Sequence, residues 1–301
     1  MIMYELVQVA ENTYYIDCPA KIGVCRTSAE EVWLIDSGND KDAGRRILKI
    51  LDANGWTLKG IINTHSNADH VGGNHFLQQR TGCQVISTEL ENAFAKFPVL
   101  EPSFLYGGYP VKELRNKFLL AVPSEPTGTL EDSLPEGFGY LPLGGHYFDM
   151  AAVRTPDNVW FLADCLFGEA TVQKYHISFI YDVRAFLQTL DQVERLEGEF
   201  FVPAHAQAGK DMKPLAALNR SKVLEIAEKI LELCREPLCF EAVLQKLFDA
   251  YGLKMDFNQY VLVGSTVRSY LAYLHDEGKL KAEFIGNQLL WESANISSKI
   301  S

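Results

Sequence analysis

The chain has 301 residues, of which 47% are hydrophobic and 22% are charged, and its formal net charge at pH 7 is −11. This composition is typical of a folded globular protein and excludes an intrinsically disordered chain. The acidic balance argues against binding to nucleic acid or to an anionic membrane through a basic face.

The first 90 residues alternate between strand and helix patterns, which is typical of an α/β fold. β-branched and aromatic runs predict strands, and apolar residues at helical spacing predict helices. We expect strands at residues 13–16, 32–35, 60–63 and 84–87, and helices at 43–51 and 73–80.

The stretch from 97 to 142 differs, because it holds seven of the twelve prolines. Proline removes a backbone donor and breaks regular elements, so this stretch predicts long loops with a short helix near 111–120. Long loops inside a compact domain are often functional, and we expect 98–142 to help form a substrate wall. Strands are expected at 147–153, 159–162 and 200–202, and a helix at 184–196.

The last section, from residue 213 onward, predicts three helices followed by a hairpin. Apolar residues follow a helical spacing over 215–233, 240–248 and 260–274, and two strand patterns flank a Gly-Asn turn at 286–287. Three helices and a hairpin indicate a small α+β, winged-helix-like domain. We therefore divide the chain into domains at residues 1–212 and 213–301.

The N-terminal residues lack the basic region and long apolar core of a signal peptide, and no apolar run reaches the roughly 20 residues of a membrane span. The six cysteines include no C-x-x-C pair, so we expect reduced and mostly buried thiols. These patterns predict a cytoplasmic protein.

Histidine and aspartate concentrate where strands are predicted to end. His65, Asp69 and His70 follow the strand at 60–63, and Asp164 ends the apolar run at 159–162. Loops at strand ends are common places for chemistry, and imidazole with carboxylate suits zinc or iron. The sequence therefore predicts a metal site.

Five motifs in register resemble those of the metallo-β-lactamase-fold hydrolase superfamily over about the first 210 residues. They are Leu34-Ile35-Asp36-Ser37-Gly38, the segment from Thr64 to Gly73, Leu143-Gly144-Gly145-His146, Phe161-Leu162-Ala163-Asp164 and Val202-Pro203-Ala204-His205. The resemblance implies a four-layer αββα sandwich.

The resemblance also implies a ligand set for one or two zinc ions, with iron or manganese as alternatives. One position would use His65, residue 67 and His146. The other would use Asp69, His70 and His205, with Asp164 bridging the two. Asp69 is the implied catalytic residue, because it would also orient the nucleophilic water. Asp36 would support a ligand imidazole through its second ring nitrogen.

Asn67 stands where the family pattern has a third histidine. A neutral carboxamide oxygen binds zinc less strongly than imidazole does. Three interpretations stay open: a weaker but intact first position with Asn67 as a direct or water-mediated ligand, a mononuclear enzyme, or a degenerate centre in a non-catalytic relative.

Tyr175 and His176 follow Asp164 closely enough to belong to a substrate wall, and Cys165 is expected to be a buried small side chain. His75 and His275 are expected to be structural.

The resemblance implies a hydrolase that uses a metal-bound hydroxide on a small-molecule substrate, and a thioester or related acyl compound is the leading expectation. The competing hypothesis is a non-catalytic or regulatory protein that uses its C-terminal section to bind a partner or nucleic acid. Residues 213–301 hold eleven Lys/Arg and eleven Asp/Glu, so this section lacks an obvious basic face and nucleic acid is not expected. We expect no membrane contact and consider a homodimer a possible assembly.

Overall fold

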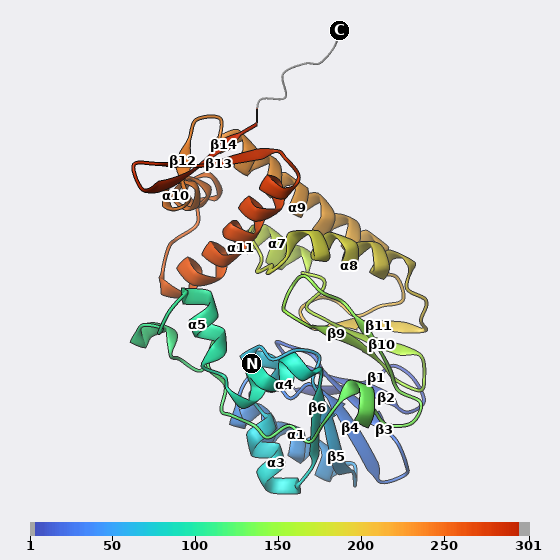
Figure 1. The fold of residues 1–301 in the computed structure, drawn as a ribbon. Helices are drawn as coiled ribbons and strands as arrows, with labels where there is room; N and C mark the ends of the chain where they lie inside the picture. Colours follow the sequence, from blue (N-terminus) through green and yellow to red (C-terminus); the bar gives the residue numbers. More distant parts are fainter. Residues whose placement is uncertain (1–3, 295–301) are drawn as a thin grey trace.

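The computed structural model describes residues 4–294, and in it two facing β-sheets are covered by helices on their outer sides (Figure 1). The first sheet has seven strands in the order β1 to β7. Strands β1 to β4 are antiparallel neighbours, whereas β4 to β7 run parallel. The strands are β1 (Glu5–Gln8), β2 (Thr13–Asp17), β3 (Ile22–Arg26), β4 (Glu31–Ile35), β5 (Thr57–Ile62), β6 (Gln84–Ser87) and β7 (Gly128–Thr129).

The second sheet has four strands in the order β11, β10, β9 and β8. Strands β10 and β11 are parallel, and the other neighbours are antiparallel. The strands are β8 (Gly139–Pro142), β9 (Ala151–Arg154), β10 (Val159–Ala163) and β11 (Phe200–Pro203). Parallel neighbours need crossover connections, which α7 (Glu169–Tyr175) and α8 (Val183–Arg195) provide between β10 and β11.

Three layers of buried apolar side chains separate the elements. Trp33 and Ile62 of the first sheet pack with Phe161 and Val202 of the second in one cluster between the sheets. A second cluster joins the outer face of the first sheet to α1 (Lys41–Ala53) and α3 (Asn74–Thr81). A third joins the second sheet to α8 and to the C-terminal helices. The predicted four-layer αββα sandwich is confirmed.

The proline-rich stretch contains more regular structure than its composition predicted. It holds α5 (Leu100–Tyr106), the 3-10 helix η1 (Lys112–Leu114), β7, α6 (Leu130–Ser133) and β8, and α4 (Glu89–Lys96) precedes it. The prediction of long loops here was therefore wrong in part. Pro102 lies in the first turn of α5, where the missing N–H costs nothing.

The predicted strand at 147–153 was wrong in its first half. Residues 143–150 form a loop, closed by a hydrogen bond from the Leu143 N–H to the Met150 carbonyl, and β9 begins at Ala151. The short helix α7 was not predicted at all.

The C-terminal section has the expected three helices and hairpin. They are α9 (Lys213–Leu233), α10 (Phe240–Tyr251), α11 (Phe257–Asp276), β13 (Leu280–Ile285) and β14 (Gln288–Ser293), to which the short strand β12 (Leu238–Cys239) adds. The winged-helix assignment and the boundary at residue 213 stay predictions. The predicted domains also include residues 1–3 and 295–301, which lie outside the described residues. One buried cluster runs from the second sheet through α8 and α9 to α11.

Within the part of the chain that is described, no helix is both long and apolar enough to cross a membrane. Five of the six free cysteines are buried, as expected, and Cys239 is partly exposed.

Candidate metal centre

The predicted site residues meet at one edge of the two facing sheets. Asp36 follows β4, the segment 65–70 follows β5, Asp164 follows β10 and His205 follows β11. His146 comes from the loop between β8 and β9. The carboxyl ends of parallel strands form a common crevice in α/β folds, which explains why residues so distant in sequence converge.

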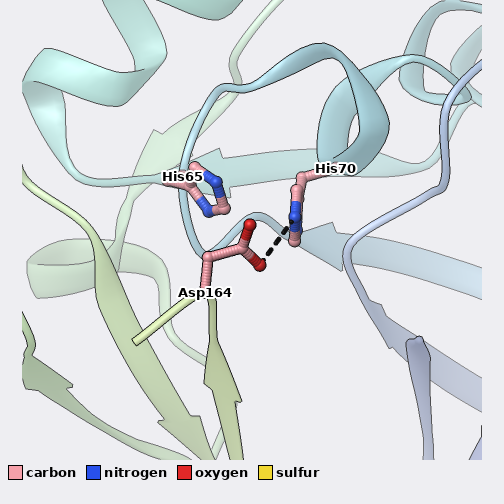
Figure 2. A group of neighbouring side chains, drawn as sticks. All are labelled: His65, His70 and Asp164. Atoms are coloured by element: carbon pink, nitrogen blue, oxygen red, sulfur yellow. Dashed lines mark ion pairs between the residues drawn. The ribbon is translucent and has the colours of Figure 1, made fainter. Parts of the chain in front are cut away.

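Asp164 lies at the centre of this group. One carboxylate oxygen, Oδ1, lies 3.1 Å from His70 Nε2 (Figure 2). The other, Oδ2, lies 3.2 Å from His205 Nε2 and 3.5 Å from His146 Nε2. Asp69 Oδ2 lies 3.1 Å from His205 Nε2 on the side that faces solvent. The carboxylate of Asp164 therefore links three imidazoles, as the implied bridging role requires.

His146 and His205 are each held by their Nδ1 atoms. His146 Nδ1 lies 3.1 Å from the carbonyl oxygen of Phe179, and His205 Nδ1 lies 2.8 Å from that of Pro19. A carbonyl only accepts, so each Nδ1 carries the proton and donates it. In the neutral ring, Nε2 then presents a lone pair to the centre.

His65 and His70 are anchored in the same way through Asp36. His70 Nδ1 donates to Asp36 Oδ2 at 2.7 Å, and the Thr64 hydroxyl donates to the same oxygen at 2.8 Å. Because this hydroxyl has only one proton, it accepts from His65 Nδ1 at 3.1 Å. All four imidazoles thus turn Nε2 inward, which is the arrangement of histidine metal ligands with outer partners.

The buried atoms at the centre are unsatisfied without an ion. His65 Nε2, His70 Nε2 and Asp164 Oδ1 have no hydrogen-bond partner among the described residues, although all three are buried. His70 Nε2 and Asp164 Oδ1 lie 3.1 Å apart, which makes them an ion pair but not a hydrogen-bonded pair. Buried polar atoms are normally paired, so such orphans need an explanation. Two sets have ligand atoms within 4.8 Å of one another: His65, His70 and Asp164, and Asp69, His70 and His205. The residues present therefore fit one or two divalent metal ions.

Without a metal ion, burial and neighbouring charges determine which imidazoles of the site are protonated. Burial lowers the pKa of His65 well below its ordinary value, and the charge on His70 adds to this effect. Burial also lowers the pKa of His146. Two of the imidazoles are therefore neutral at pH 7 and need no proton loss before they bind a cation.

The other two imidazoles are surrounded by carboxylates. Burial opposes the charged form of His205, but Asp164 and Asp69 outweigh it and raise the pKa of His205 to about 10. The carboxylates around His70 raise its pKa in the same direction. Burial acts to raise the pKa of Asp69, yet His70 and His205 outweigh it and lower that pKa to about 2. A metal ion would thus replace protons on these rings.

Comparisons with known proteins identify the family of this chain. The sequence profile of the metallo-beta-lactamase superfamily matches residues 17–205. The chain belongs to the metallo-β-lactamase superfamily. This span covers the motif segments from Asp36 to His205, including the Asn67 position.

Among curated relatives, hydroxyacylglutathione hydrolases give short matches. The chain is 52% identical to that of Methylococcus capsulatus over 40 residues, which is 13% of this chain and 16% of the relative. It is 32% identical to that of Brucella ovis over 92 residues, or 29% of this chain and 33% of the relative. The chain therefore spans only about a sixth to a third of the length of these relatives.

Solved structures extend the likeness to most of the chain. A beta-lactamase domain protein from Burkholderia ambifaria has a TM-score of 0.74 at 14% identity and covers 96% of this chain and 94% of its own. A metallo-beta-lactamase family protein from Thermus thermophilus has a TM-score of 0.68 at 20% identity, covering 91% of this chain and 94% of its own. The metallo-beta-lactamase from Pontibacter korlensis has a TM-score of 0.54 at 18% identity and covers 73% of this chain and 98% of its own. At these identities the likeness shows the fold alone.

Two glycines of the superfamily motif allow its loop to pack against the loop after β4. A Cβ on Gly72 would lie 2.3 Å from the Asn39 carbonyl, and one on Gly73 would lie 2.3 Å from the Ser37 carbonyl oxygen. Backbone cannot move aside as a flexible side chain can. The Gly-Gly pair therefore keeps His70 within reach of Asp36.

Replacement of Asp36 by asparagine is expected to weaken metal binding about 10–100-fold. Asn keeps the Oδ1 that accepts from the Thr64 N–H, but an NH₂ group would face His70 Nδ1. His70 would then shift its proton to Nε2 and lose its inward lone pair. Asp36 has a φ of 64°, which asparagine tolerates well, so the backbone stays unstrained. Titration with Zn²⁺ against a competing chelator measures the change.

The control for this variant is Ser37→Ala. The Ser37 hydroxyl bonds the His70 carbonyl and touches no imidazole. Asp36→Asn protein with the wild-type affinity would show that Asp36 does not set the tautomer of His70.

Two buried acids at this site were not predicted. Glu91 of α4 accepts from the Ser66 N–H at 2.9 Å and the Ser66 hydroxyl at 2.6 Å, and burial raises its pKa to about 7. Glu101 of α5 accepts from Asn67 Nδ2 at 2.8 Å, and burial raises its pKa well above the ordinary value. Both lie outside the motifs, and no sequence signal marks either one.

A cavity of about 470 Å³ opens over the centre. Asn67, Asp69, His146, Asp164 and His205 line its floor. Its walls are mostly apolar, and they include Phe118, Leu119, Phe167, Ile177, Phe179, Leu262 and Val263. A larger cavity of about 670 Å³ lies between α5, α8 and α11, but none of the site residues lines it.

The two predicted substrate-wall residues lie in different places. Tyr175 lines the cavity, whereas His176 does not and instead stacks on Tyr251 at a ring separation of 4.8 Å. His176 therefore has a packing contact in this structure, and its place in a substrate wall stays a prediction. His75 and His275 bond backbone carbonyls away from the centre, and Cys165 is fully buried, as expected.

Proposed function

We propose that this protein is a metal-dependent hydrolase of small acyl compounds, with thioesters as the leading class. The observation that carries the proposal is the convergence of three inward Nε2 atoms, those of His70, His146 and His205, on the Asp164 carboxylate at the floor of a cavity. A ligand atom of His65 lies within 4.8 Å of those of His70 and Asp164. A cavity of about 470 Å³ is within the usual range for small-molecule sites. The short matches to hydroxyacylglutathione hydrolases support a thioester.

When bound, a divalent ion would act as a Lewis acid that polarises the scissile carbonyl and lowers the pKa of water. The protein's own residues supply the rest. Asp69 is ionised at neutral pH and lines the cavity floor, so its carboxylate accepts a hydrogen bond from the attacking water and orients it. Attack on the carbonyl carbon breaks the carbon–sulfur bond and releases a thiol and a carboxylic acid.

The cavity walls favour an uncharged, apolar substrate. No lysine or arginine is among the described residues that line the cavity, so a carboxylate or phosphate on the substrate would find neither an ammonium nor a guanidinium group there. The apolar lining residues instead suit an alkyl or aryl group. We therefore expect neutral thioesters to be better substrates than thioesters of glutathione or coenzyme A.

The C-terminal section forms one wall of the same cavity. Gln259, Leu262 and Val263 of α11 line it, so this section contributes to its own chain's site. Leu105 of α5 and Val261 of α11 belong to one small buried cluster, which holds the two helices together. Zinc as the ion, a homodimer and a cytoplasmic location stay predictions.

A substrate panel tests the proposal. Metal-replete protein is incubated with N-acetylcysteamine thioesters of increasing chain length, with glutathione and coenzyme A thioesters, and with a β-lactam and a phosphodiester. We expect kcat/KM to be highest for the neutral thioesters. Hydrolysis of none of these compounds would contradict the proposal and favour the non-catalytic alternative.

A further inference from the structure

Asn67 stands at the one departure from the superfamily's ligand motif, and its side chain lies between Glu101 and His146. Asn67 Nδ2 donates to Glu101 Oε1 at 2.8 Å, and Asn67 Oδ1 lies 3.2 Å from His146 Nε2. A carboxamide has donors on one side and an acceptor on the other. The residue that accepts from the NH₂ group of Asn67 therefore decides which way its Oδ1 atom points.

Glu101 fixes that choice. For the carboxylate form of Glu101, which a cation bound nearby favours, the opposite orientation would place Asn67 Oδ1 2.8 Å from Glu101 Oε1, and two acceptors would face each other in a buried place. Glu101 is only 5% exposed and sits on α5, which packs against α11. The carboxamide oxygen therefore points toward the metal centre.

The space that this oxygen faces is bordered by other acceptors. His146 donates through Nδ1 to the Phe179 carbonyl, so Nε2 of the neutral ring is an acceptor 3.2 Å from Asn67 Oδ1. The Asp164 carboxylate lies 3.5 Å from the same Nε2. His65 Nε2 is buried and has no partner among the described residues. Several acceptor atoms that lie close together without a donor between them can coordinate a cation.

We propose that Asn67 Oδ1 is a ligand atom of the first metal position and that Glu101 is its positioning residue. His65 Nε2, His146 Nε2 and the Asp164 carboxylate complete the position, which thereby has two nitrogen and two oxygen donors. Carbonyl and carboxylate oxygens suit Mn²⁺ better than imidazole does, so this position favours Mn²⁺ over Zn²⁺ more than a three-histidine position would. The inference rests on the proposed function for the presence of metal.

Four variants of the full-length protein test this inference: Glu101→Met, Glu101→Gln, Asn67→Ala and Asn67→His. Each is dialysed to equilibrium with Mn²⁺ or Zn²⁺, and the bound metal is measured by elemental analysis. Co²⁺-loaded samples are compared by visible absorption, which reports the coordination of each ion.

Wild-type protein is expected to bind two ions. Glu101→Met should weaken the first ion at least about 10-fold, because the carboxamide loses its anchor, and should leave the second unchanged. Glu101→Gln should rescue the wild-type behaviour, since its amide oxygen still accepts from Asn67. Asn67→Ala should lose the first ion, and Asn67→His should shift its preference toward Zn²⁺.

The retained second ion shows that a variant is folded, and Asn67→Ala tests the ligand directly if Glu101→Met does not fold. Two ions bound by Glu101→Met with unchanged affinity and Co²⁺ spectrum would overturn the positioning role. A wild-type protein that binds a single ion would overturn the ligand assignment. Two bound ions without hydrolysis of any substrate would contradict the proposed function and leave this inference standing.

Discussion

Replacement of Asp164 by asparagine is expected to lower kcat/KM by more than about 100-fold. Loss of an outer partner of a metal ligand costs up to about 100-fold, and Asp164 is expected to be a ligand itself. Asp164 lies within 3.5 Å of Nε2 of His70, His146 and His205 and would bridge the two proposed metal positions. Asparagine keeps the size of the side chain but removes its charge, so at least one ion per chain should be lost. Elemental analysis and steady-state kinetics measure the two effects.

Asp157→Asn is the matched control for this variant. Asp157 accepts from the Asn12 N–H and the Thr13 hydroxyl, away from the metal centre. It should keep both the metal and the activity. Asp164→Asn protein that retains its full metal content and rate would remove Asp164 from the centre.

Asp69→Asn is expected to lower kcat about 10²–10⁴-fold, the usual contribution of a positioned general base. Asp69 is the carboxylate of the centre nearest to solvent, with 34% of its side chain exposed, and it lines the cavity floor. Asparagine can still contact an ion through Oδ1, but without the negative charge it holds the attacking water less firmly. We therefore expect kcat to fall more than KM changes.

Steady-state kinetics at saturating metal distinguish a catalytic role of Asp69 from a role as a metal ligand alone. If excess metal restores the wild-type kcat of Asp69→Asn, then Asp69 acts only as a ligand and does not orient the nucleophile. A kcat that stays low while the metal content is complete supports the catalytic assignment.

The residues of the candidate metal centre could be predicted because they carry local signals. His65, His70, Asp164 and His205 each follow an apolar strand pattern, and parallel strands bring such positions to one edge. The motif resemblance then supplied the pairing of Asp36 with a ligand imidazole, which the structure shows at 2.7 Å from His70.

Glu101 could not be predicted, because its role depends on a contact 34 residues away in the chain. Pro98 and Pro102 flank it, and prolines at this density favour loops over helices. The helix α5 forms nonetheless, with Pro102 in its first turn. Only the folded chain places this acid against Asn67.

The position of α11 in the fold also could not be predicted from the sequence. Its apolar spacing predicted a helix and its buried face, and the helix is confirmed over Phe257–Asp276. Periodicity shows which residues are buried but not what covers them. That Leu262 and Val263 line the cavity of the metal centre follows from the packing of α11 over α5.

Removal and return of the metal tests the proposed centre most directly. Protein is treated with a chelator, freed of it by gel filtration, and shown by elemental analysis to hold no metal. Its hydrolysis of a neutral acyl thioester should disappear and return with two equivalents of Mn²⁺ or Zn²⁺, whereas Asp164→Asn should not recover. Full hydrolytic activity in the metal-free wild-type protein would contradict the account.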